Sequence, residues 1–157
     1  MKVLFALEGL DGISKNALSA VLDRCWSEQS KFRVISVFAP SETVTAYTPA
    51  LYSPSAYDAI ARAEHEEFVE RQAQVADVVE LLKKNLTVAE VTGAVLSGDV
   101  SEKILEEADR WEADLIVCGT HGRHGLSKFF CGSVAEKIAT LAKCSVEVVK
   151  TISIDAA

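Results

Sequence analysis

Ala113-Asp114-Leu115-Ile116-Val117-Cys118-Gly119 is the stretch of sequence that decides the fold. A short, continuous apolar run that ends at a glycine predicts a strand buried on both faces of a sheet. A glycine-rich loop follows this strand, and residues 133–143 then predict a helix. A buried strand that leads through a loop into a helix is typical of α/β proteins with a parallel sheet.

The same alternation of strands and helices continues along the rest of the chain. Other apolar runs predict four further strands, at 3–7, 33–38, 87–96 and 145–149. Apolar stripes predict three further helices, at 14–28 with Ser14 as its N-cap, at 55–85, and directly after the turn at 97–99. Residues 39–56 are rich in proline, serine, threonine and tyrosine and predict an irregular excursion. This order predicts one open parallel sheet with helices on both faces.

The loop after residue 118 carries the motif G-x2-G-x9-G-S, formed by Gly119, Gly122, Gly132 and Ser133. Glycines let the backbone turn sharply and approach a ligand closely. The free N–H groups at the start of the following helix favour a phosphate, to which the Ser133 hydroxyl can donate. An alternative interpretation needs no ligand, because Ser133 and Glu136 have the spacing of a capping box.

Composition limits the partners that this protein can have. The chain has 157 residues, with 16 Lys and Arg against 23 Asp and Glu, and a formal net charge of −7. This charge argues against nucleic acid or an anionic membrane surface as the main partner, but backbone N–H groups can still bind a small phosphate ligand. The first apolar run reaches Glu8 too soon for a signal peptide, and the four cysteines contain no CxxC pair. We therefore expect a cytoplasmic protein with reduced thiols.

The glycine loop, the strand at 113–117 and the closing strand resemble the universal stress protein family. The similarity covers essentially the whole chain, including the leading strand that ends in an acid, the V-I-S-V-F segment at 34–38, the long insertion and Gly98. It implies a single domain over 1–157 with a Rossmann-like, adenine nucleotide alpha hydrolase-like fold. The implied sheet has five parallel strands in the order 3-2-1-4-5.

In family members that bind ATP, this loop wraps the ribose and the triphosphate. The resemblance implies that Gly119 lies near the ribose and that the backbone of Cys118 faces the adenine. Two residues of the first two strands, Ala6 and Val37, would line the adenine slot. The residues that would hold the phosphates are Gly122, Gly132, Ser133 and Val134.

The sequence departs from the family pattern at two places. The family usually has Asp followed by Gly-Ser after the first strand, and this Asp contacts the nucleotide. Here Glu8 ends the strand and is our first choice for that acid, with Asp11 as the second. In the last strand, which often pairs two subunits in the family, Glu147 replaces an apolar residue. A charge on an edge strand is also a common protection against unwanted pairing.

The hypothesis from the sequence is a binding protein for ATP, AMP or another adenine nucleotide that acts as a stress-linked regulator and forms a homodimer through 145–149. One alternative is an interaction protein of the same fold that binds no nucleotide, and a weaker one is a slow ATPase that uses Mg²⁺. Three other loop residues are interpreted as solvated or structural and not as ligands: His121, His124 and Cys131. For Arg123 and Lys128 two interpretations stay open, as surface residues or as side chains that neutralise a phosphate.

Overall fold

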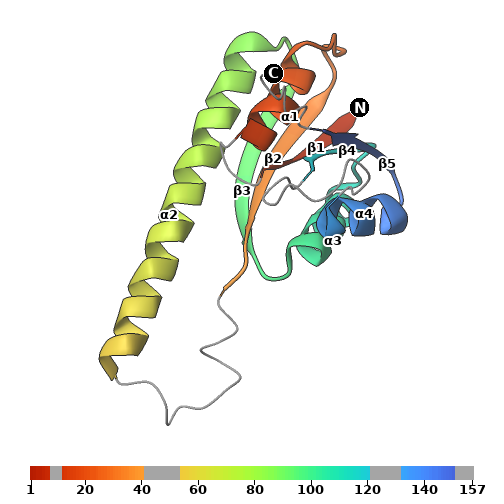
Figure 1. Cartoon of the computed structure of the whole chain (residues 1–157). Coiled ribbons are helices and arrows are strands. Elements are labelled where there is room, and N and C mark those ends of the chain that lie inside the picture. Colours follow the sequence, from red (N-terminus) through yellow and green to blue (C-terminus); the bar gives the residue numbers. More distant parts are fainter. Residues whose placement is uncertain (8–11, 41–53, 121–131, 151–157) are drawn as a thin grey trace, which may run out of the picture.

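A computed structural model describes residues 1–7, 12–40, 54–120 and 132–150 (Figure 1). In this part of the chain, strands and helices alternate as the sequence predicts. The elements are β1 (Lys2–Leu7), α1 (Gly12–Leu22), β2 (Lys31–Phe38), α2 (Pro54–Asn85), β3 (Glu90–Ser97), α3 (Val100–Trp111), β4 (Leu115–Gly119), α4 (Ser133–Leu141) and β5 (Ser145–Val149).

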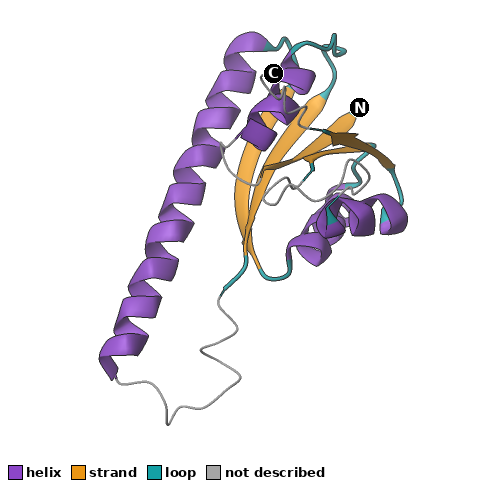
Figure 2. Ribbon diagram, viewed as in Figure 1, coloured by secondary structure: helices purple, strands orange, loops and turns teal. Residues whose placement is uncertain are grey.

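The five strands form one parallel sheet in the order β3-β2-β1-β4-β5, which confirms the expected fold class and strand order (Figure 2). β1 is the central strand, and its Ala6 pairs with Ile35 of β2 on one side and Cys118 of β4 on the other. Along the chain, β2 and β3 are therefore added on one side of β1, and β4 and β5 are then added on the other side.

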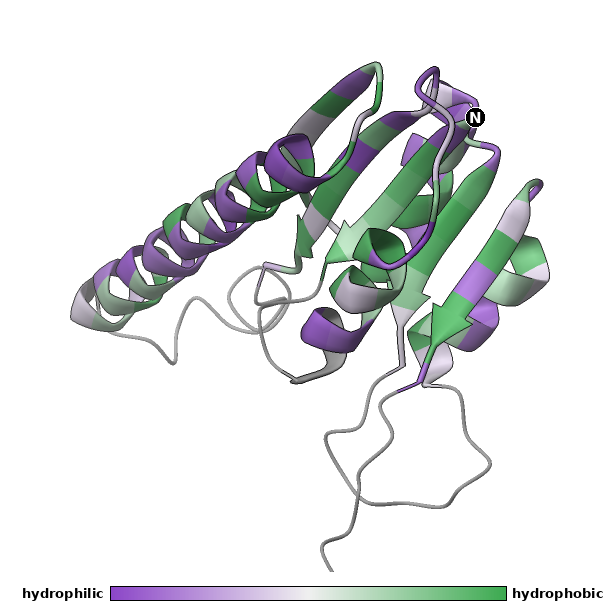
Figure 3. Ribbon diagram, turned by 90° about the horizontal axis from the view of Figure 1, so that it is seen from above, coloured by the Kyte–Doolittle hydropathy of each residue, from purple (hydrophilic) through white to green (hydrophobic). Residues whose placement is uncertain are grey.

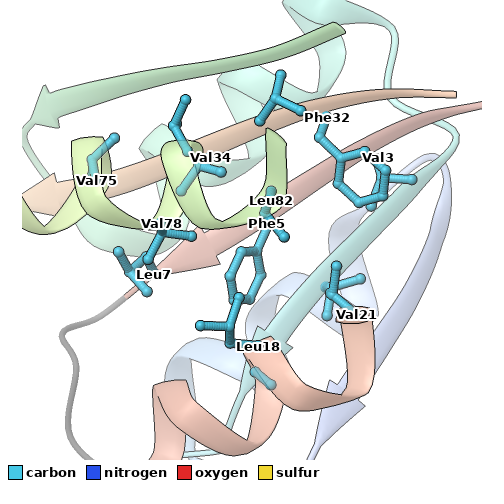
Figure 4. Close-up of a cluster of buried hydrophobic side chains, with 14 of the residues drawn as sticks. Val3, Phe5, Leu7, Leu18, Val21, Phe32, Val34, Val75, Val78 and Leu82 are labelled. Carbon is cyan, nitrogen blue, oxygen red and sulfur yellow. The ribbon is translucent and has the colours of Figure 1, made fainter. Parts of the chain in front are cut away.

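Side chains alternate across the sheet and build a core on each face. Phe5 of β1 points into the core that α1 and α2 cover, and Leu4 points into the core that α3 and α4 cover. Figure 4 shows Phe5 between Leu18 of α1 and Leu82 of α2. The strands are largely hydrophobic, whereas α2 carries many hydrophilic residues (Figure 3). Both faces of the sheet are thus buried, which explains the continuous apolar runs in the sequence.

Helix α1 is shorter than the sequence predicts. It starts before Ser14, so the prediction of Ser14 as N-cap is wrong, and it ends at Leu22 instead of residue 28. The reason lies in Trp26, whose indole N–H donates to the Val21 carbonyl oxygen at 2.7 Å. In a continuing helix, the N–H of Cys25 would donate to that oxygen. The Trp26 ring packs edge-on against Phe32 at 5.0 Å, and Cys25 is left exposed.

Helix α2 runs along β2 and β3, and its N-terminal part extends beyond the strands (Figure 1). Its predicted apolar stripe is buried at Val75, Val78, Val79 and Leu82. Toward the N-terminus the stripe fades, because Ile60 is only half-buried and Ala63 is exposed. The buried part of the stripe therefore corresponds to the part of α2 that lies on the sheet.

Helix α3 begins at a turn that the sequence predicts. Gly98 adopts φ +137°, which side-chain-bearing residues rarely adopt, and Asp99 is the N-cap. The Asp99 carboxylate accepts from the Glu102 backbone N–H at 2.9 Å and from the Ser101 hydroxyl at 2.7 Å. These two bonds hold the pKa of Asp99 below its usual range. The turn fixes the start of the helix that carries Val100 and Ile104.

β5 lies at one edge of the sheet, and its Glu147 makes an ion pair within the chain. The Glu147 carboxylate lies 2.7 Å from the guanidinium of Arg24, which also stacks over Trp26 with 5.1 Å between Arg24 Cζ and the ring centroid. The charge of Glu147 is therefore directed to the α1 face of the sheet and is neutralised there.

Gly93 of β3 allows α2 to approach the sheet. A Cβ atom at this position would lie 2.5 Å from Val75 Cγ1 and 2.8 Å from Val79 Cγ2. We expect Gly93→Ala to lower the free energy of unfolding by about 1–3 kcal/mol, as overpacking usually does, in urea denaturation followed by circular dichroism.

The matched control is the double variant Gly93→Ala with Val75→Ala, in which the smaller side chain at position 75 makes room for the new Cβ atom at position 93. Its loss of stability should be smaller than the sum of the two single losses. A Gly93→Ala protein as stable as the unaltered chain would contradict the close approach of α2.

Candidate functional site

A pocket opens at the carboxyl ends of the strands, where the strand order reverses between β1 and β4. In open α/β sheets, ligands bind at this place. The empty space at this pocket is about 760 Å³, a figure that includes space open to solvent. It is lined by Ala6, Leu7, Ile35, Val37, Ala39, Glu67, Arg71, Val100, Ile104, Cys118, Gly119, Val134, Ala135 and Ile138.

The structure brings five of the sequence-predicted residues together in this pocket: Ala6, Val37, Cys118, Gly119 and Val134. They come from β1, β2, β4 and α4, which are distant in sequence. Gly132 and Ser133 directly precede Val134 at the start of α4. Glu8, Asp11 and Gly122 lie outside the described residues, as do the remaining loop residues at 121–131.

The start of α4 differs from a capping box. Gly132 is the N-cap, and Ser133 is the first residue of the helix, so the interpretation of Ser133 as N-cap is wrong. No side chain of the described residues caps this end. The first backbone N–H with a helical acceptor is that of Glu136, which donates to the Gly132 carbonyl oxygen at 3.0 Å. The first-turn N–H groups before it have no acceptor within the helix and form the type of site that binds anions.

Helix α2 adds a charged pair that sequence reasoning missed. Arg71 donates from Nε and Nη2 to the same oxygen of Glu67, at 3.0 and 2.9 Å. From Nη1 it donates to the Ser36 hydroxyl at 3.0 Å. Ser36 is fully buried, and the Arg71 side chain is 20% exposed. The guanidinium is therefore fixed between β2 and α2 at the wall of the pocket.

A helical period in the sequence could have revealed Arg71. Positions 71, 75, 78 and 82 share one face of α2, and the last three are buried against the sheet. Arg71 continues this stripe by one turn toward the carboxyl ends of the strands. The Glu67 side chain is half exposed, and it also lines the pocket.

The pocket combines two chemical environments. Val37, Val100, Ile104 and Ile138 provide an apolar wall suited to a flat, weakly polar group. The start of α4, which no described side chain caps, provides N–H donors suited to an anion. Arg71 and Glu67 are the only charged side chains among the described residues that line the pocket.

Other predicted features have simple structural roles. Cys25, Cys118 and Cys144 form no disulfide within the described part of the chain, and burial raises the pKa of Cys144 above its ordinary value. In the described ranges, no group of three or more metal-ligating side chains is found, and no helix is long and apolar enough to cross a membrane. Trp111 packs against the core beside α3 and α4.

Known proteins resemble this chain over part or all of its length. A protein of Methanocaldococcus jannaschii, "Universal stress protein MJ0531", is 43% identical over 76 residues, which are 45% of either chain. The chain thus spans less than half the length of this curated relative. "Universal stress protein YxiE" of Bacillus subtilis is 27% identical over 153 residues, covering 95% of this chain and 98% of the relative.

Solved structures share the fold. "Hypothetical protein MJ0577" superposes with a TM-score of 0.78 at 18% identity, covering 97% of this chain and 96% of that one. A universal stress protein family protein of Arabidopsis thaliana, solved with AMP bound, has a TM-score of 0.65 at 17% identity and coverages of 98% and 93%. The universal stress protein of Archaeoglobus fulgidus in complex with dAMP has a TM-score of 0.60 at 17% identity and coverages of 96% and 98%.

Residues 1–150, nearly the whole chain, match the family described as "Universal stress protein family". The parallel sheet with the order β3-β2-β1-β4-β5 agrees with this match. The chain therefore belongs to the universal stress protein family.

Proposed function

We propose that this protein binds ATP or another adenine nucleotide in the pocket at the carboxyl ends of the strands, and that it acts as a stress-linked regulator. The observation that carries the proposal is that one pocket joins an apolar slot to a helix start that no described side chain caps. A nucleotide has the same two parts, a flat base and an anionic phosphate chain.

The proposed pose follows the two environments. The base lies against Ala6 and Val37, near the backbone of Cys118, and the ribose lies near Gly119. The phosphates lie at the N–H groups of Ser133 and Val134, with Gly132 leaving room for them. We further propose that Gly122 contacts the phosphates and that Glu8 contacts the nucleotide as the acid after β1. The AMP and dAMP complexes of proteins with the same fold support an adenine nucleotide as the ligand.

Backbone recognition reconciles this ligand with the charge of the chain. A protein with a formal net charge of −7 repels polyanions at long range. Amide groups and the positive end of the α4 dipole act only within the first turn, where they favour a phosphate. With ATP, Mg²⁺ would accompany the triphosphate and reduce its charge. Among the described residues the cysteines form no disulfide, which agrees with our proposal of a cytoplasmic location.

The nucleotide proposal is tested by calorimetric titration of the protein with ATP, with and without Mg²⁺. Mass analysis of any nucleotide that the denatured protein releases complements the titration. We expect binding of ATP, and we expect Gly132→Val to weaken it at least about tenfold, because the added side chain covers the start of α4.

The matched control is Ala139→Val, which enlarges an exposed residue of the same helix. This variant should bind ATP like the unaltered chain. If the unaltered protein carries no nucleotide and does not bind millimolar ATP, the proposal is wrong and the interaction-protein hypothesis takes its place.

We also propose that the chain forms a homodimer through β5. Its outer edge has no pairing strand among the described residues, and Glu147 is already paired with Arg24 within the chain. The backbone groups of this edge can therefore pair with a second copy without bringing an unpaired carboxylate into the interface.

Light scattering of the purified protein tests this assembly and should give the mass of two chains. Val148→Pro removes one backbone donor from the strand and should shift the mass toward one chain. A single-chain mass for the unaltered protein at concentrations of about 100 μM would contradict the proposal.

A further inference from the structure

We propose that Arg71 and Glu67 of α2 read the base of the bound nucleotide and make the pocket selective for adenine over guanine. This inference rests on the proposed function and assigns a role to residues outside the glycine motif. Arg71 and Glu67 differ from the rest of the pocket in their chemistry. Apart from these two, every described lining residue has an apolar side chain, a thiol or no side chain.

The sheet order puts the pair at the base end of the pocket. α4 follows β4 on one side of β1, and β2 lies on the other side. A nucleotide whose phosphates lie at the start of α4 and whose body crosses β1 therefore has its base against the end of β2. Arg71 is bonded there to Ser36, the residue directly before Val37.

The pair is held in place before any ligand arrives. Arg71 is hydrogen-bonded to a fully buried hydroxyl and to Glu67, one helical turn earlier on α2. A serine in the otherwise apolar 34–38 segment of β2 is explained by this contact. Fixed donors lose little freedom when they bind, so they discriminate more strongly than mobile ones.

The pair has both a donor and an acceptor left for a ligand. A guanidinium has five N–H donors, and the bonds to Glu67 and Ser36 use three of them. One N–H on Nη1 and one on Nη2 remain. Both bonds to Glu67 end on its Oε1, so Oε2 has no protein partner among the described residues.

On the edge of the base that carries N7, a neighbouring donor and acceptor match adenine and not guanine. Adenine presents an amino donor at N6 beside a ring-nitrogen acceptor, whereas guanine presents two acceptors, O6 and N7, on the corresponding edge. Arg71 can donate to the ring nitrogen of either base. The Glu67 carboxylate can accept from the adenine amino group, but it repels the guanine O6.

Titrations with ATP and GTP, each on the full chain, test this inference. We expect the unaltered protein to prefer ATP over GTP by about tenfold or more, the size of one good pair of base contacts. Arg71→Met keeps the length of the side chain but removes the donors, and it should weaken ATP about tenfold. Glu67→Gln replaces the acceptor with an amide that can donate to O6, and it should bring the two affinities within about threefold of each other.

Arg62→Met is the matched control, because Arg62 lies on the same helix and is exposed. Its Nε donates to the Asp58 carbonyl oxygen, away from the residues that line the pocket. It should leave both affinities unchanged. If the unaltered protein binds ATP, but Arg71→Met leaves the affinity for ATP unchanged and Glu67→Gln leaves the ratio of the ATP and GTP affinities unchanged, the inference is wrong and the proposed function stands. If Arg71→Met does not fold, the Glu67→Gln ratio still decides. If the unaltered protein binds neither nucleotide, both proposals are wrong.

Discussion

The pairing of β1 on both sides is the constraint on which the rest of the structure depends. β1 pairs with β2 along one edge and with β4 along the other, and its side chains fill both cores. The helices that follow β1 and β4, which are α1 and α4, cover opposite faces of the sheet. Among the described residues, the carboxyl end of β1 therefore lies open between them. The pocket lies at that point, so the fold itself creates the site.

Much of the fold could be predicted because both faces of the sheet are buried. The continuous apolar runs at 3–7 and 115–118 have one physical explanation, and the helices between them make the sheet parallel. The resemblance added the strand order. The errors lie where a tertiary contact overrides the local pattern. α1 ends early because Trp26 takes the carbonyl of Val21, and a helical period cannot reveal that bond.

The candidate site could be predicted in part for a related reason. The family resemblance implied Ala6, Val37, Cys118, Gly119 and Val134, and the structure brings them together. The helical period of α2 places Arg71 on the buried stripe, but its contact with Ser36 depends on how far α2 reaches along the sheet and is visible only in three dimensions. The capping-box pattern was misleading because Gly132 takes the N-cap position from Ser133.

The proposed function requires that this acidic protein holds an anion at the start of α4. The most direct test is an amide NMR titration of the full chain with ATP. If ATP binds at this place, the amide signals of four residues should shift together and saturate: Ser133, Val134, Ala6 and Val37. The amide signals of Lys31 and Leu115, at the opposite ends of the strands, should not shift. Shifts confined to those opposite ends, or no shift at millimolar ATP, would contradict the proposed function.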